Sequence, residues 1–281
     1  MPAIVDAHHH VWDLSVRDQD WITGEQLAPI RRDFTLDDLA PLAHKCGVTA
    51  TVLVQTVTVE EETPEFLALA DDSDLVAGVV GWADLTRPGI AETLDRLAEL
   101  PGGRFLKGVR HQVQGEADPE WLLRPDVLRG LAAVADAGLA YDLVVLPHQL
   151  PACVEAAAAL PGLTFVLDHA GKPPIASGVT EPWARSLLAL AALPNTVCKL
   201  SGLVTEADWA TWTPGALRPY AETVLEAFGP GRLMFGSDWP VCTLAATYEQ
   251  VMDVAGELTG SLTSHERDMV FGGTATRVYG L

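Results

Sequence analysis

The chain has 281 residues, 48% of them hydrophobic and 20% charged, which is enough apolar material for the core of a large domain. Its 18 Lys and Arg residues stand against 38 Asp and Glu residues, and the formal net charge is -20. A surface this acidic repels phosphate backbones and anionic lipid headgroups. Nucleic acid and membranes are therefore excluded as expected partners.

The cysteines and the N-terminus bear on the cellular compartment. Cys46, Cys153, Cys198 and Cys242 are widely spaced and form no Cys-x-x-Cys motif, so we expect reduced thiols rather than disulfides or a zinc-thiolate site. The first residues form no basic leader, and no uninterrupted run of about 18 apolar residues occurs. The sequence therefore predicts a cytoplasmic protein.

Eight short apolar runs, rich in β-branched residues, are spaced along the chain and predict strands. Most are apolar almost without interruption, which is typical of parallel strands covered by helices. The predicted strands are 3–7, 49–55, 75–81, 105–109, 140–145, 164–168, 196–200 and 233–236.

Segments with helical spacing separate these runs. Thr35 is a capping residue before one such segment, and Gly47 ends it. The others cover 90–100, 127–137, 150–160 and 219–228. Alternating strands and helices predict an α/β fold, a single (β/α)8 TIM barrel over residues 1–281. An open doubly wound sheet is the alternative, but no Gly-x-Gly-x-x-Gly or P-loop motif follows a predicted strand.

Polar residues follow every predicted strand. In (β/α)8 barrels, catalytic groups lie at these carboxyl ends of the strands. We therefore expect the active site among them. They include Asp6, His8, His9, His10, Gln55, Trp82, Asp84, Arg110, His111, His148, Asp168, His169, Lys199, Ser201 and Asp238.

The first strand ends in a His-x-His pair. With a period of two, His8 and His10 share a face and His9 points the other way. Two imidazoles on an inward face can bind one metal or one substrate oxygen. Asp6 has the same parity and would fix a ring tautomer from below. A polar strand end with solvated imidazoles is the alternative.

Two further residues are candidates for the reactive centre. His169 follows the sixth predicted strand at the barrel mouth, although an isolated histidine is more often a hydrogen-bonded core residue. Asp238 ends a buried strand, where a carboxylate is costly unless it is paired or used. Among imidazoles it could bind a metal or take a proton from water.

Positive charge near the strand ends comes from Arg110 and Lys199. These side chains could orient a substrate carboxylate or stabilise an oxyanion. They could equally form salt bridges with Asp84, Asp168 or Asp238, and both interpretations stay open.

Four more side chains are candidates for substrate binding. His148 follows the fifth predicted strand, and Trp12, Trp82 and Trp239 flank the polar strand ends. An indole packs well against the C–H face of a sugar ring, yet tryptophan near a barrel rim is more often part of the core or of a lid.

Six strand-end motifs occur in a specific order along the chain. They are Val5-Asp-Ala-His8-His-His10-Val-Trp-Asp13, Lys107-Gly-Val-Arg110, Leu146-Pro-His148-Gln-Leu-Pro151, Val166-Leu-Asp-His169-Ala-Gly-Lys-Pro173, Lys199-Leu-Ser-Gly202 and Phe235-Gly-Ser-Asp238-Trp-Pro240. Together they resemble the amidohydrolase superfamily and, within it, the lactonase branch, which includes fuconolactonase, rhamnonolactonase and pyrone-dicarboxylate lactonase types. The closing segment Val270-Phe-Gly-Gly-Thr-Ala-Thr-Arg-Val-Tyr279 is similar to the last helix of that branch.

The resemblance implies a distorted barrel in which water attacks a carbonyl, with His8, His10, His169 and Asp238 as the reactive centre. The fourth strand ends in Arg110, and no lysine stands where the wider superfamily has a carbamylated bridging lysine, so a two-metal site is not expected. One divalent metal on these three histidines and the aspartate would suit zinc. Not all members of the branch depend on a metal, so chemistry without one stays open.

We therefore expect hydrolysis of a lactone, with a sugar-acid lactone of carbohydrate catabolism as the substrate. Asp238 would take a proton from water while the histidines polarise the carbonyl, directly or through one metal. Arg110, His148 and Lys199 would orient hydroxyl or carboxylate groups. Two alternatives remain: a mononuclear-zinc decarboxylase of the same superfamily, and a catalytically silent barrel that binds a small molecule or a partner.

Overall fold

Eight parallel strands form a barrel in which each strand pairs with the next strand of the chain. In the computed structural model, which describes residues 3–281, the strands follow in order around the sheet. They are β1 (Ile4–His9), β2 (Val48–Val54), β3 (Val76–Gly81), β4 (Leu106–His111), β5 (Ala140–Leu143), β6 (Phe165–Leu167), β7 (Thr196–Leu200) and β8 (Leu233–Phe235). Just beyond β8 the ring closes on β1, where the Asp238 N–H donates to the His8 carbonyl at 2.8 Å. The predicted (β/α)8 barrel is confirmed.

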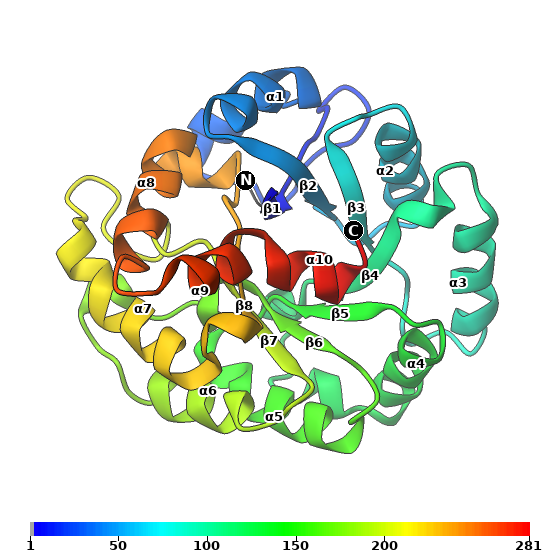
Figure 1. Ribbon diagram of the computed structural model, residues 1–281. Helices are drawn as coiled ribbons and strands as arrows, with labels where there is room; N and C mark the ends of the chain where they lie inside the picture. The colour runs from blue at the N-terminus through cyan, green and yellow to red at the C-terminus, as the bar shows by residue number, and fades with distance from the viewer. Residues whose placement is uncertain (1–2) are drawn as a thin grey trace.

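Helices between the strands cover the outside of the barrel (Figure 1). They are α1 (Leu36–Lys45), α2 (Glu62–Asp71), α3 (Ile90–Glu99), α4 (Pro125–Asp136), α5 (Leu150–Ala159), α6 (Trp183–Ala191), α7 (Pro214–Phe228) and α8 (Tyr248–Leu258), followed by α9 (Ser264–Asp268) and α10 (Thr274–Tyr279). Thr35 begins α1 as expected, because its N–H donates to Asp38 Oδ2 at 2.9 Å. Helix α7 begins earlier than predicted, since Thr213 caps it and Pro219 is accommodated inside it. Within residues 3–281, no helix has both the length and the apolarity to cross a bilayer.

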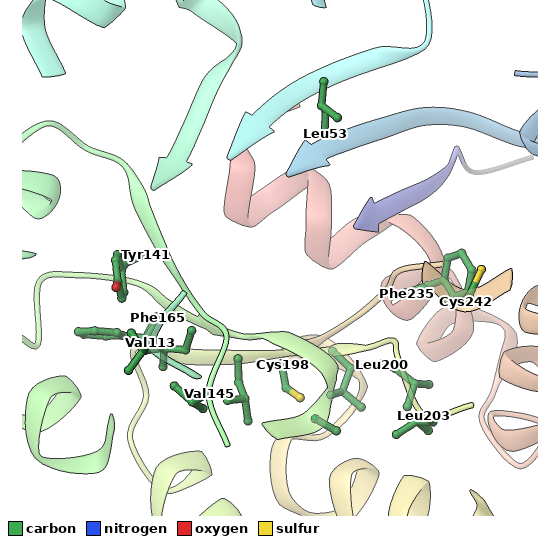
Figure 2. Close-up of a cluster of buried hydrophobic side chains, with 14 of the residues drawn as sticks. Leu53, Val113, Tyr141, Val145, Phe165, Cys198, Leu200, Leu203, Phe235 and Cys242 are labelled. Atoms are coloured by element: carbon green, nitrogen blue, oxygen red, sulfur yellow. The ribbon is translucent and has the colours of Figure 1, made fainter. Parts of the chain in front are cut away.

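Two apolar layers stabilise the barrel. The larger layer fills the space between strands and helices, and Figure 2 shows part of it around Phe165, Cys198 and Leu200. The smaller layer lies inside the barrel, where inward-facing strand residues such as Val54 and Val166 meet Tyr279 of α10. Helix α10 crosses the barrel at the end where the strands begin (Figure 1). The opposite end, where the strands finish, is left to form a site.

Candidate active site

A β-bulge in β1 determines which of its side chains point into the barrel. Between Asp6 and His9, β1 advances three residues while β2 advances two. The extra residue shifts by one the pattern in which successive side chains point into and out of the barrel. Asp6 therefore points toward α8, where its carboxylate accepts hydrogen bonds from the Ser237 N–H (2.8 Å) and the Tyr248 hydroxyl (2.9 Å). The expectation that Asp6 lies below the inward histidines and fixes a ring tautomer is wrong, because the bulge turns it to the other side.

His8 and His10 face each other, with 3.2 Å between their Nε2 atoms. His10 Nδ1 lies 2.8 Å from the Val54 carbonyl, which can only accept a hydrogen bond. When this ring is neutral, Nδ1 therefore carries the hydrogen and Nε2 presents a lone pair. Burial lowers the pKa of His8 well below its usual range, so this ring is neutral at physiological pH. His9 points the other way, as expected, and its Nε2 lies 2.9 Å from the Thr51 hydroxyl.

His169 reaches the same place from a strained turn after β6. Its φ is 52°, in the left-handed region that few residues other than glycine adopt. The Ser201 hydroxyl lies 2.9 Å from His169 Nδ1 and orients the ring, while burial lowers the pKa of His169 to about 4. Gly202 borders the ring so closely that a Cβ atom there would lie 2.7 Å from Nδ1. The turn, the serine and the glycine together direct Nε2 toward the other histidines.

Asp238 completes the group from the end of β8. Its Oδ1 atom lies 3.6 Å from His10 Nε2, 3.8 Å from His8 Nε2 and 3.9 Å from His169 Nε2. Burial alone would raise the pKa of this carboxyl, but the three imidazoles lower it below its usual range, so the carboxylate is ionised. Its φ of 59° is also left-handed, so strained backbone brings the carboxylate to this position.

Three of these side chains form a donor set that fits one divalent metal, while His169 groups instead with His8 and Asp168. Ligand atoms of His8, His10 and Asp238 lie within 4.8 Å of one another, and all three side chains are buried. Imidazole nitrogens that bind zinc at about 2.1 Å lie about 3.4 Å apart in a tetrahedral site. The 3.2 Å between the Nε2 atoms of His8 and His10 is close to that spacing, and His10 Nε2 has the free lone pair that ligation requires.

A network of buried charges supports His8. Arg110 Nη1 contacts Asp168 Oδ2 at 2.9 Å, and Lys199 Nζ contacts Asp168 Oδ1 at 3.0 Å and Asp142 Oδ2 at 2.5 Å. His8 Nδ1 lies 3.2 Å from Lys199 Nζ and 3.3 Å from Asp168 Oδ1. Both cations therefore form salt bridges, as one of the two interpretations predicts: Arg110 with Asp168, and Lys199 with Asp168 and Asp142. Lys199 is 0% exposed, so it holds His8 from below and does not reach a ligand.

A cavity of about 230 Å³ lies over these groups at the end of the barrel. Four predicted site residues line it: His10, Arg110, His169 and Asp238. The rest of its wall comes from residues in loops that follow the strands, and none of these residues was predicted from the sequence. Lys172 alone among them lies within a predicted motif, the segment 166–173. These further residues are Trp21, Leu27, Thr56, Gln112, Gln114, Val144, Lys172, Thr205, Glu206, Trp209, Val241 and Leu244.

Besides Lys199, four of the predicted substrate-binding side chains lie outside this cavity. Trp12 packs edge-on against Trp21, with ring centroids 5.6 Å apart, and Trp239 is buried. The Trp82 indole N–H donates to a histidine of β4 at 3.0 Å, and His148 is exposed. The three indoles therefore serve packing within the fold rather than forming the wall of the cavity.

Known proteins resemble this chain along almost its whole length. The amidohydrolase family model matches residues 5–281. The L-fucono-1,5-lactonase of Burkholderia multivorans is 41% identical and covers 99% of this chain and 96% of that protein. The enzyme of the same name from Burkholderia ambifaria is 40% identical, over 98% and 94%. The crystal structure of an amidohydrolase from Burkholderia multivorans with bound zinc has a TM-score of 0.92 at 41% identity and covers 99% of both chains. The expected family is thereby confirmed, and the chain belongs to the amidohydrolases.

Proposed function

We propose that this chain opens the ring of a sugar-acid lactone, with L-fucono-1,5-lactone as the first substrate to test. Two relatives named for that activity match it over nearly their whole length, which supports a hydrolase that acts on an ester bond. The observation that carries the proposal is the position of the Asp238 carboxylate, whose Oδ1 atom lies 3.6 to 3.9 Å from three imidazole Nε2 atoms at the cavity.

Asp238 is the proposed general base. Its carboxylate takes a proton from water, whose oxygen attacks the lactone carbonyl carbon. The ring C–O bond then breaks, and the leaving alkoxide takes the proton back from Asp238, so the product is a hydroxy acid. Arg110 borders the cavity, and its guanidinium is held by Asp168 (2.9 Å) and Gln55 (2.9 Å). It is thus positioned to stabilise negative charge on the carbonyl oxygen.

His8, His10, His169 and Asp238 are also the proposed ligands of one divalent metal, with zinc as the best match. His10 Nε2 has a lone pair, which a metal can use but which cannot donate a hydrogen bond to a carbonyl. The zinc in the related crystal structure supports this assignment. When bound, zinc supplies Lewis-acid polarisation of the carbonyl and lowers the pKa of water.

The two alternative functions have less support. A zinc decarboxylase would act on an acidic substrate, whereas the two relatives that cover nearly the whole chain are both named L-fucono-1,5-lactonase. A barrel that only binds a ligand, without catalysis, would gain nothing from a strained and buried carboxylate among three imidazoles.

Metal removal is the experiment that tests this function. We expect the purified protein to release protons from L-fucono-1,5-lactone faster than spontaneous hydrolysis, measured with a pH indicator. Dialysis against a chelator should lower the rate more than about tenfold, and zinc should restore it, with metal content measured in parallel. Full activity without bound metal would contradict the proposed metal site but not the proposed lactonase function. Silence on all sugar-acid lactones would contradict the function, and CO₂ release from acidic substrates would then favour the decarboxylase.

Gly202→Ala is expected to lower kcat/KM about 100-fold, because a methyl group there overlaps the His169 ring and displaces it. Gly202 has a φ of 65°, so part of any loss of stability would come from the backbone alone. Gly178→Ala is the matched control, since its φ is 69° and nothing lies within 4 Å of the added Cβ. Equal kcat/KM in the two variants would show that the position of His169 is not critical.

A further inference from the structure

An ion pair lies in the wall of the cavity beside the reactive centre. Lys172 Nζ contacts Glu206 Oε1 at 3.0 Å, and the two side chains are 22% and 23% exposed. Lys172 comes from the loop after β6 and Glu206 from the loop after β7. Neither side chain contacts the proposed base, so the pair has no part in the proton transfer described above.

Backbone contacts tie this pair to His169. The Lys172 N–H donates to the His169 carbonyl at 2.8 Å, and Lys172 has a left-handed φ of 52°. The Glu206 carbonyl accepts from the Ala176 N–H at 3.0 Å, which links the two loops. A lysine in this region is strained, and such strain is typical of functional sites. The pair is therefore held at a set position relative to the imidazole.

The ion pair leaves hydrogen-bonding groups free. An ammonium has three N–H donors and a carboxylate has two acceptor oxygens, so one contact between them leaves a donor and an acceptor side by side. Adjacent hydroxyl groups of a sugar match that arrangement, because one hydroxyl can donate to the carboxylate while its neighbour accepts from the ammonium. The pair is neutral overall, so it offers no net attraction to an anionic group.

Trp209 adds an apolar surface to the same cavity. Its indole N–H donates to the Thr205 carbonyl at 2.9 Å, which holds the ring in the loop that also carries Glu206. An indole face packs well on the C–H face of a sugar ring. Polar groups for hydroxyls and an aromatic ring for C–H bonds are thus combined in one wall.

We propose that Lys172 and Glu206 recognise two adjacent hydroxyl groups of the substrate and so determine its specificity, an assignment that rests on the proposed lactonase function. The substrate is then a neutral polyhydroxylated lactone rather than a lactone that carries further carboxylates. Removing either partner weakens binding of the hydroxylated ring and leaves the chemistry at the ester unchanged.

Two lactones with the same ester and ring size test this assignment. L-fucono-1,5-lactone carries ring hydroxyls, and δ-valerolactone has none. For Lys172→Met and for Glu206→Gln we expect kcat/KM on L-fucono-1,5-lactone to fall about 10- to 100-fold, mainly through a higher KM. On δ-valerolactone the same variants should stay within about twofold of the unchanged protein.

The double variant Lys172→Met/Glu206→Gln removes both charges, so neither charge is left unpaired to disturb folding. It should show the same loss of preference for L-fucono-1,5-lactone over δ-valerolactone. Asp71→Asn is the control for charge removal, because it breaks the Arg104–Asp71 pair (2.6 Å) at the other end of the barrel. An equal loss on both lactones, or a loss in kcat with KM unchanged, would overturn the assignment. Failure of the unchanged protein to open either lactone would instead contradict the lactonase function, and this assignment with it.

Discussion

Asp238→Asn should lower kcat/KM for lactone opening by about a thousandfold while the protein remains folded. Asparagine has nearly the same shape as aspartate but cannot take a proton from water. Its backbone also tolerates the left-handed conformation that Asp238 adopts with a φ of 59°, so little further strain arises. The loss should therefore appear in kcat rather than in stability.

The measurement is steady-state kinetics on L-fucono-1,5-lactone with excess zinc, together with thermal unfolding. Asp84→Asn is a matched control, because Asp84 also follows a strand but accepts a hydrogen bond from the Thr86 hydroxyl (2.6 Å) and does not line the cavity. It should keep kcat/KM within about twofold of the unchanged protein. An Asp238→Asn variant that retains most of its activity would rule out this carboxylate as the general base.

The barrel could be predicted because local patterns alone determine it. Buried parallel strands are short apolar runs, and the predicted run 196–200 coincides with β7 (Thr196–Leu200), while 75–81 differs from β3 (Val76–Gly81) by one residue. Helices α2, α6 and α8 were not among the predicted segments. Helix α2 follows an acidic stretch and contains Pro64 in its first turn, and it has no strong apolar stripe to mark it.

The proximity of four candidate site residues could be predicted because the fold gathers the ends of its strands. His8, His10, His169 and Asp238 are distant in sequence, yet the closed ring brings each strand end to the same place. The side on which Asp6 lies could not be predicted, because one extra residue in a bulge reverses the alternation and leaves no mark in the residue pattern.

The cavity wall could not be predicted for a different reason. Its loops have no periodicity, and their paths depend on contacts between distant segments, such as the Ala176 N–H donating to the Glu206 carbonyl. Lys172 and Glu206 meet only because two such loops lie side by side. Charge pairing across loops is a property of the folded chain, so the sequence pointed to Arg110 and Lys199 as the positive charges of the site but not to Lys172.

Lys199→Met should destabilise the protein by about 3–5 kcal/mol at neutral pH, because it removes the cation that lies between two buried carboxylates. Lys199 contacts both Asp142 and Asp168, and all three side chains are 0% exposed. Asp168 would keep its contact with Arg110, and Asp142 would keep its contact with the neutral hydroxyl of Tyr279 at 2.8 Å. Urea unfolding measures the change in the free energy of unfolding.

The pH dependence separates lost charge from lost packing. Burial raises the pKa of Asp142, and the Lys199 charge lowers it in part, so the variant should raise this pKa further. When the pKa of a carboxyl is higher in the folded state than in the unfolded state, its protonation stabilises the folded protein. Stability is therefore highest below the unfolded pKa and declines as pH rises through the folded pKa. The deficit of Lys199→Met should accordingly shrink as the pH is lowered from 8 toward about 5.

Two further variants complete this test. Lys107→Met removes a lysine of β4 whose ammonium donates to the Gly280 carbonyl at 3.2 Å, and it should cost about 1 kcal/mol at every pH. Adding Asp142→Asn to Lys199→Met removes the unpaired carboxylate, so it should restore part of the lost stability and abolish the pH dependence. A deficit that persists unchanged in the double variant would mean that Lys199 stabilises the barrel through packing of its aliphatic chain. Restored stability in the double variant would instead show that the barrel tolerates the buried charges next to His8 only because each of them has a partner of opposite charge.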